Sequence, residues 1–166
     1  GISDAKANNF DWIVISSGGK LIDMAKNEGK EYIKIPNGLQ PRAAFGYLTL
    51  AVSKIIDVSE GSNYVSQLND VSSYLDKLSK KDEESDINKL SIDICESINR
   101  KTVIIYSGTD MSRVISSRWK TQINENAKSK AFVGHLPEIH HNEILSWDAD
   151  KEGSKNNYVV IFIRDQ

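Results

Sequence analysis

A strand-like run, a turn and an amphipathic helix follow one another twice in this 166-residue chain, and this order constrains the fold more than any other feature. In the first half, residues 12–15 are apolar and mostly β-branched, residues 16–19 are Ser-Ser-Gly-Gly, and residues 20–26 have helical spacing. A second strand-like run at residues 32–35 completes a βαβ unit. Because parallel strands need such a crossover, this half predicts a parallel sheet.

The second half repeats the order. Residues 102–106 predict a strand, and the turn after them offers Thr109 or Asp110 as the N-cap of a helix. In that helix, apolar residues at every fourth position from Met111 to Ile123 predict a buried stripe. The remaining elements are expected in this order: a strand at 131–133, a short helix at 137–147, a polar loop at 148–157 and a strand from 158.

Three helices are expected between the two cycles. Residues 43–56 are apolar on every side, as in a buried helix, whereas the residues from Tyr64 to Leu78 place their apolar side chains on one face. Residues 87–98 predict a third helix, in which Cys95 lies beside the apolar stripe and is expected to pack in the core.

A charged segment at residues 80–86 separates the two cycles and predicts a boundary. We therefore predict two α/β lobes, residues 1–80 and 81–166, with parallel sheets flanked by helices. The chain lacks an initiator Met and stops just after a strand-like run, so we expect it to be a piece of a longer polypeptide with both lobes incomplete.

Composition excludes several classes of partner. The net charge of -2 gives no electrostatic reason to expect nucleic acid, and no apolar run reaches the roughly 20 residues of a membrane span. A single cysteine cannot form an internal disulfide, which is consistent with a reducing cytoplasm.

Polar residues gather where loops lead from strands into helices, the usual place for sites in parallel sheets. Ser16 and Ser17 precede a helix and either form a structural turn or contact an anion such as phosphate. Arg42 follows Pro41 at an expected helix start, where a cation is either solvated or held for an anion.

Two further candidates lie in the second half. Glu125, between Asn124 and Asn126, is either a solvated glutamate or a general base. All three histidines fall in residues 135–141, which leaves metal binding, proton transfer and a structural role open. His140 and His141 are adjacent, however, and would point about 100° apart on a helix, which disfavours a shared metal.

Four segments in this order resemble the bifunctional phosphoglucose/phosphomannose isomerases, members of the sugar isomerase (SIS) domain superfamily. They are residues 15–21, 40–44, 124–128 and 136–142, of which Asn-Glu-Asn-Ala-Lys and Pro-Glu-Ile-His-His-Asn are the specific ones. The resemblance covers residues 12–163.

The resemblance implies an enzyme that interconverts glucose 6-phosphate, and mannose 6-phosphate, with fructose 6-phosphate through a cis-enediol. It implies that Glu125 moves the proton between C1 and C2, that His141, contributed by the neighbouring subunit of a homodimer, assists ring opening, and that Arg42 stabilises the enediolate. Neither metal nor organic cofactor is expected. Ser16 and Ser17 are candidate phosphate contacts.

The chain departs from the family pattern in two places. The main phosphate-binding loop lies upstream of the matched region, and a catalytic lysine is expected downstream of Gln166. We therefore expect this piece alone to be inactive, because phosphate binding supplies much of the energy used at the reacting carbons. The alternative function is a non-catalytic SIS module that binds sugar phosphates. A metal-dependent enzyme that uses the histidine cluster is a third hypothesis.

Overall fold

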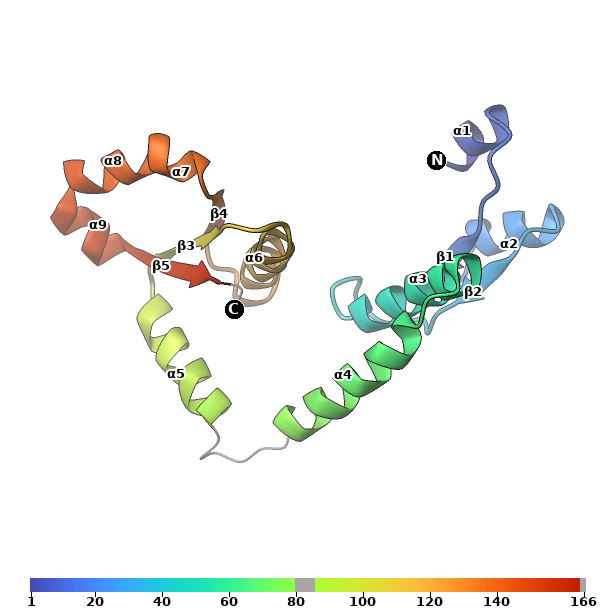
Figure 1. Ribbon diagram of the computed structural model, residues 1–166, viewed down its shortest axis with the longest axis horizontal. Helices are drawn as coiled ribbons and strands as arrows, with labels where there is room; N and C mark the ends of the chain where they lie inside the picture. The colour runs from blue at the N-terminus through green and yellow to red at the C-terminus, as the bar shows by residue number, and fades with distance from the viewer. Residues whose placement is uncertain (80–85, 165–166) are drawn as a thin grey trace. The chain divides into compact units, whose positions relative to one another are not determined.

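The computed structural model describes residues 1–79 and 86–164 (Figure 1). The chain divides into two compact units, Gly1–Lys80 and Lys81–Gln166, and each is described by itself. Most of the charged segment that predicts a boundary, residues 80–85, lies outside the described residues.

The first unit is built on a two-stranded parallel sheet. Strand β1 pairs with β2 in a register that places Val14 beside Tyr32 and Ser16 beside Lys34, which confirms the predicted βαβ unit. The elements of this unit are α1 (Ile2–Ala7), β1 (Val14–Ser16), α2 (Lys20–Asn27), β2 (Tyr32–Lys34), α3 (Phe45–Glu60) and α4 (Tyr64–Ser79).

A small core joins α2 to this sheet. Val14 of β1 and Ile22 and Ala25 of α2 are buried together, with Ile2 and Trp12 packed against them. Burial of these apolar side chains holds the crossover helix on one face of the strands.

Helices α3 and α4 form a hairpin held by one carboxylate. Asp57, in the last turn of α3, accepts hydrogen bonds from the backbone N–H groups of Tyr64 (2.8 Å) and Val65 (2.9 Å) and from the hydroxyl of Ser62 (2.6 Å). It therefore satisfies N–H groups at the start of α4, which lack partners within that helix.

The helix predicted over residues 43–56 is present as α3, but the prediction that it is buried is wrong for this unit. Helix α3 begins at Phe45, and Ala51 is the buried residue that it contains. Its main packing partner among the described residues is α4, so apolar side chains on its other faces are exposed, among them Phe45, Tyr47, Leu50 and Val58.

The second unit is built on three parallel strands in the order β4-β3-β5. The central strand is the most buried, with Val103 and Ile105 fully inaccessible. Its elements are α5 (Asp86–Ile98), β3 (Thr102–Ser107), α6 (Asp110–Gln122), the π-helix η1 (Ile123–Ala127), β4 (Ala131–His135), α7 (Glu138–His141), α8 (Glu143–Ala149), α9 (Lys151–Asn157) and β5 (Tyr158–Ile163). The expected short helix is thus two helices, α7 and α8.

Two expectations for this unit are wrong. Residues 148–157 are not a polar loop, because the Asp150 side chain accepts a hydrogen bond from the Gly153 N–H at 2.9 Å and caps α9. Cys95 is exposed on α5 and does not pack in the core.

Helices lie on both sides of this sheet (Figure 1), although Phe132 and Phe162 of its outer strands stay exposed. The hydroxyls of Ser107 on β3 and Ser116 on α6 are 3.0 Å apart, which places α6 on one face. The preceding residue, Tyr106, points to the other face, because neighbouring side chains of a strand alternate. There its ring lies over Gly134 of β4, beside Ile139 of α7.

The sheet-facing side of α6 is not the apolar stripe expected from the sequence. Ser112 and Ser116 are buried, whereas Met111 is 66% exposed and Trp119 is 38% exposed. Hydrogen bonds explain the difference, because Thr109 caps the helix through the N–H of Ser112 and Ser116 contacts Ser107.

The structure therefore confirms an α/β fold with two small parallel sheets flanked by helices. That the two units are lobes of the SIS type, each incomplete, stays a prediction.

Gly134→Ala is expected to destabilise the second unit by about 1–3 kcal/mol. A Cβ at this position would lie 2.7 Å from the Tyr106 ring and 2.8 Å from Ile139, so packed side chains must move. Thermal unfolding of the native protein by circular dichroism tests this. The control, Gly46→Ala, adds a Cβ with nothing within 4 Å and should not lower the unfolding temperature; equal behaviour of both variants would contradict the prediction.

Asp57 should make the α3–α4 hairpin sensitive to acid. The Ser62 hydroxyl, together with the N–H groups of Val65 and Tyr64, lowers the pKa of Asp57 below 3.8 despite partial desolvation. A carboxyl whose pKa is lower in the folded state stabilises above its unfolded pKa and loses that contribution as the pH falls. Denaturant unfolding should therefore show Asp57→Asn less stable than wild type at pH 6, with the difference narrowing below pH 3.8. A pH-independent difference would refute this role.

Candidate functional site

The loop after β1 is an ordered turn before α2. The Ser16 hydroxyl donates to the Gly18 carbonyl at 2.9 Å and accepts from the Gly18 N–H at 3.3 Å. Gly19 precedes α2 with a φ of 73°, which favours glycine. Ser16 thus serves the turn itself, while Ser17 is exposed beside it.

Arg42 lies between β2 and α3, in a partly buried position. The backbone N–H groups of Ala43 and Ala44 both donate to the Gln40 carbonyl, so a tight turn precedes the helix. Pro41 therefore does not open α3, which begins three residues after Arg42. Since β1 and β2 are parallel, the loop at Ser16 and the segment leading to Arg42 leave the sheet from the same edge.

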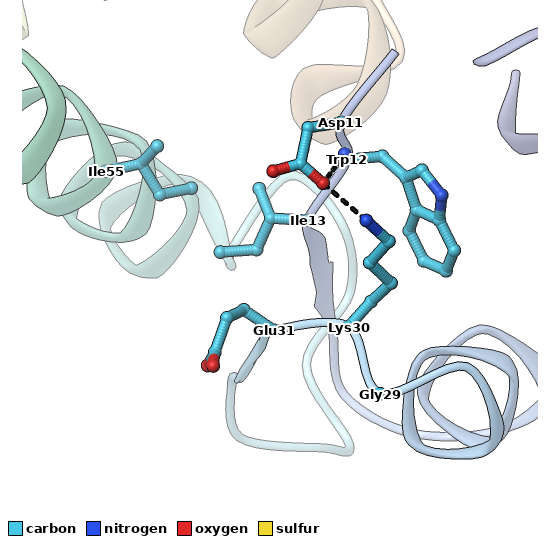
Figure 2. A pocket seen from close by; sticks show the side chains of 7 residues that line it. All are labelled: Asp11, Trp12, Ile13, Gly29, Lys30, Glu31 and Ile55. Carbon is cyan, nitrogen blue, oxygen red and sulfur yellow. Dashed lines mark hydrogen bonds and ion pairs between the residues drawn. The ribbon is translucent and has the colours of Figure 1, made fainter. Parts of the chain in front are cut away.

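A hollow of about 440 Å³ lies at the other edge of this sheet (Figure 2). Lys30 donates to Asp11 at 2.6 Å within it, and this hydrogen bond is the main reason that the pKa of Asp11 is lowered. Both residues precede the strands, so this hollow lies away from the carboxyl-edge loops that carry Ser16 and Arg42.

Glu125 lies in η1, at the point where α6 ends and the chain turns toward β4. Its side chain is exposed, and Lys128, just after η1, has a left-handed backbone with φ 54°. The carboxylate is therefore presented on an irregular turn rather than on a regular helix.

The three histidines occupy different settings. His135 ends β4 and forms a 2.9 Å hydrogen bond through Nδ1 with the buried Ser107 hydroxyl. His140 and His141 are exposed at the end of α7. Over residues 1–79 and 86–164, no group of three His, Cys, Asp or Glu side chains could hold a metal ion.

Glu125 and His141 are not brought together within one chain. Helix α6, which leads into Glu125, packs on the face of the sheet to which Ser107 points. Helix α7, which ends at His141, packs on the opposite face through Ile139 and Gly134. A layer of three paired strands separates the two helices, whereas proton transfer requires contact at about 3 Å.

A cleft that the sequence analysis did not single out as a site lies at the carboxyl edge of the second sheet. Its volume is about 340 Å³, and it is lined by Ser107, Gly108, Thr109, Ser112, Leu136, Phe162, Ile163 and Arg164. The available signal was the small polar turn between β3 and α6, which parallels the Ser-Ser-Gly-Gly turn after β1.

Behind this edge, Tyr106 links β3 to α8. Trp147 Nε1 donates to the Tyr106 hydroxyl at 3.0 Å, and that hydroxyl donates to Glu143 at 3.1 Å. Burial, reinforced by the Glu143 carboxylate, raises the pKa of Tyr106 above 10.0. The phenol therefore stays neutral and acts as a structural hydrogen-bonding group at ordinary pH.

Comparison with known proteins shows which family this chain resembles. Residues 87–166 match the family described as bacterial phospho-glucose isomerase C-terminal SIS domain. The bifunctional phosphoglucose/phosphomannose isomerases of Aquifex aeolicus and Caldicellulosiruptor bescii are 33% and 36% identical to this chain, over 90% and 89% of its length. A D-glucosamine-6-phosphate 4-epimerase of Sulfolobus acidocaldarius is 36% identical over 91% of the chain. No solved structure shows a significant match.

Most of the second unit, residues 87–166, thus matches the SIS domain of the bacterial phospho-glucose isomerase C-terminal type. The chain belongs to the bifunctional phosphoglucose/phosphomannose isomerase family, as its Asn-Glu-Asn-Ala-Lys and Pro-Glu-Ile-His-His-Asn segments predict. It spans 43% to 45% of the length of these three relatives. Among the helices of the described part, none is long and apolar enough to cross a membrane.

Proposed function

We propose that this chain is part of an aldose–ketose isomerase that interconverts glucose 6-phosphate, and mannose 6-phosphate, with fructose 6-phosphate. The family membership supports the reaction class, and the relatives that carry the name of this activity align over most of the chain. The reaction moves one proton between C1 and C2 and one between oxygens, so it needs no external oxidant.

The residues suit the individual steps. In the open-chain aldose, the Glu125 carboxylate takes the C2 proton, and the released electron pair forms the C1–C2 double bond while the π bond of the C1 carbonyl breaks and leaves its electrons on O1. A proton then moves from O2 to O1 in the cis-enediol intermediate. When Glu125 returns its proton to C1, the C1–C2 double bond becomes single and the C2 carbonyl of the ketose forms. His141 supplies a proton to the ring oxygen during ring opening. Arg42 stabilises the negative charge that develops on the enediolate oxygens. The exposed hydroxyl of Ser17, next to Ser16 in the chain, contacts the phosphate group of the substrate.

The observation that carries this proposal is the separation of Glu125 and His141. Both side chains are exposed, yet Glu125 follows α6 and His141 ends α7, and these two helices pack on opposite faces of one sheet. Two side chains arranged in this way can act on one sugar when each comes from a different copy of the chain. In a twofold dimer, each of the two equivalent sites then takes Glu125 from one subunit and His141 from the other.

Glu125→Gln in the native full-length protein should lower kcat for glucose 6-phosphate isomerisation about 10²- to 10⁴-fold, the usual contribution of a general base. The amide keeps the size of the side chain but cannot take the proton, so KM should change little. A coupled assay that detects fructose 6-phosphate measures this. Glu96→Gln, at an exposed position on α5, is the matched control and should keep wild-type turnover.

Subunit mixing tests the shared site. Glu125→Gln and His141→Asn proteins, each nearly inactive alone, should recover about a quarter of wild-type activity when coexpressed in equal amounts. Half of the random dimers then contain one fully native site out of two. The presence of mixed dimers is verified by purification through two different affinity tags. If these mixed dimers have no isomerase activity, the site is not built from two subunits.

A second candidate is a sugar-phosphate 4-epimerase. The Sulfolobus acidocaldarius relative that carries this name is as similar to the chain as the Caldicellulosiruptor bescii isomerase. Incubation of the native protein with glucosamine 6-phosphate, followed by separation of the C4 epimers, distinguishes the two. Epimerisation without aldose–ketose conversion would favour this candidate, and ligand binding without either reaction would favour a non-catalytic module.

A further inference from the structure

The backbone that carries Glu125 departs from regular helix. In η1 the N–H of Lys128 donates to the carbonyl of Ile123, five residues earlier, which defines a π-turn. Such turns are rare, and they occur frequently at functional sites. Some local interaction must hold this one in place.

Two side chains close the turn. Asn124 Nδ2 donates to the carbonyl oxygen of Ser129 at 2.8 Å, and Lys128 Nζ donates to the carbonyl oxygen of Glu125 at 2.6 Å. Lys128 has φ 54° and ψ 25°, a left-handed conformation that a residue with a side chain adopts when its surroundings hold it there. Asn124 is partly buried, in contrast to the exposed Glu125 beside it.

The Asn124 hydrogen bond connects the turn to a rigid element. Ser129 lies two residues before Ala131, the first residue of β4, which is 2% exposed and pairs with Val103 of the central strand. The position of the Ser129 carbonyl is therefore determined by the buried sheet. Through Asn124, the same sheet determines the path of the π-turn.

Loss of this connection would change where Glu125 points. A regular α-helix advances about 100° per residue, whereas a π-turn advances less, so a change between the two rotates the side chains that follow Ile123. A carboxylate that takes a proton from carbon must be held in a narrow range of positions, because small displacements slow such reactions strongly.

We propose that Asn124 is a positioning residue for Glu125. Its amide fixes the π-turn to the start of β4 and so sets the direction of the carboxylate, without contact to the sugar. This inference rests on the proposed function, in which Glu125 is the base, and extends it to a residue that holds the base in place.

Asn124→Ala in the native full-length protein should lower kcat about 10- to 100-fold with KM changed less than about twofold. Asn124→Asp keeps the size of the side chain but removes the N–H donor, so it should lower kcat in the same way. This variant tests the proposal if the alanine variant folds poorly. Ser129→Ala is the matched control, because it removes a hydroxyl and leaves the carbonyl that accepts the bond. Wild-type kcat in both Asn124 variants would overturn the proposal.

A double-mutant cycle separates positioning from a general structural role. In the Glu125→Gln background, Asn124→Ala should cause no further loss of kcat, because no base remains to be positioned. An equal loss in both backgrounds would overturn the positioning role alone. Full activity of Glu125→Gln would instead overturn the proposed function, and the inference with it.

Discussion

The second unit depends on the pairing of β3 with parallel strands on both sides. Val103 and Ile105 are fully buried on this strand, and its partners β4 and β5 run in the same direction. Parallel neighbours cannot be joined by a tight hairpin, so the chain must cross over the sheet after each strand. Helix α6 makes the first crossover and helices α7 to α9 make the second. This constraint decides where each candidate side chain emerges.

The alternation of side chains along β3 then assigns the helices to their faces. Ser107 joins α6 through Ser116, while Tyr106 joins the other layer through Glu143 and Trp147 of α8. Glu125 follows α6, on the face to which Ser107 points, and His141 lies in α7, on the face to which Tyr106 points. The separation that supports a site shared between two chains is therefore a consequence of sheet pairing, and not of the loops alone.

Local sequence signals predicted most of the elements. The βαβ unit at residues 12–35, the amphipathic helices from Tyr64 and at 87–98, and the strand and capped helix around Thr109 are all present, because each rests on hydrophobic period or turn residues. Predictions of which side chains are buried were less accurate. The apolar stripe at Met111 and Trp119 is substantially exposed while Ser112 and Ser116 are buried, because hydrogen bonds to Thr109 and Ser107 orient α6.

The amino-acid sequence by itself determined the α/β class, the family and the residues that its motifs nominate, Glu125, His141 and Arg42. The fold class, the family and these candidate residues depend on residue identity and on spacing along the chain. Only the tertiary structure decided that Glu125 sits on a π-turn tied to β4 by Asn124, and that α6 and α7 lie on opposite faces. Hydrogen bonds and strand pairing between residues distant along the chain produce these features, and no local period encodes them.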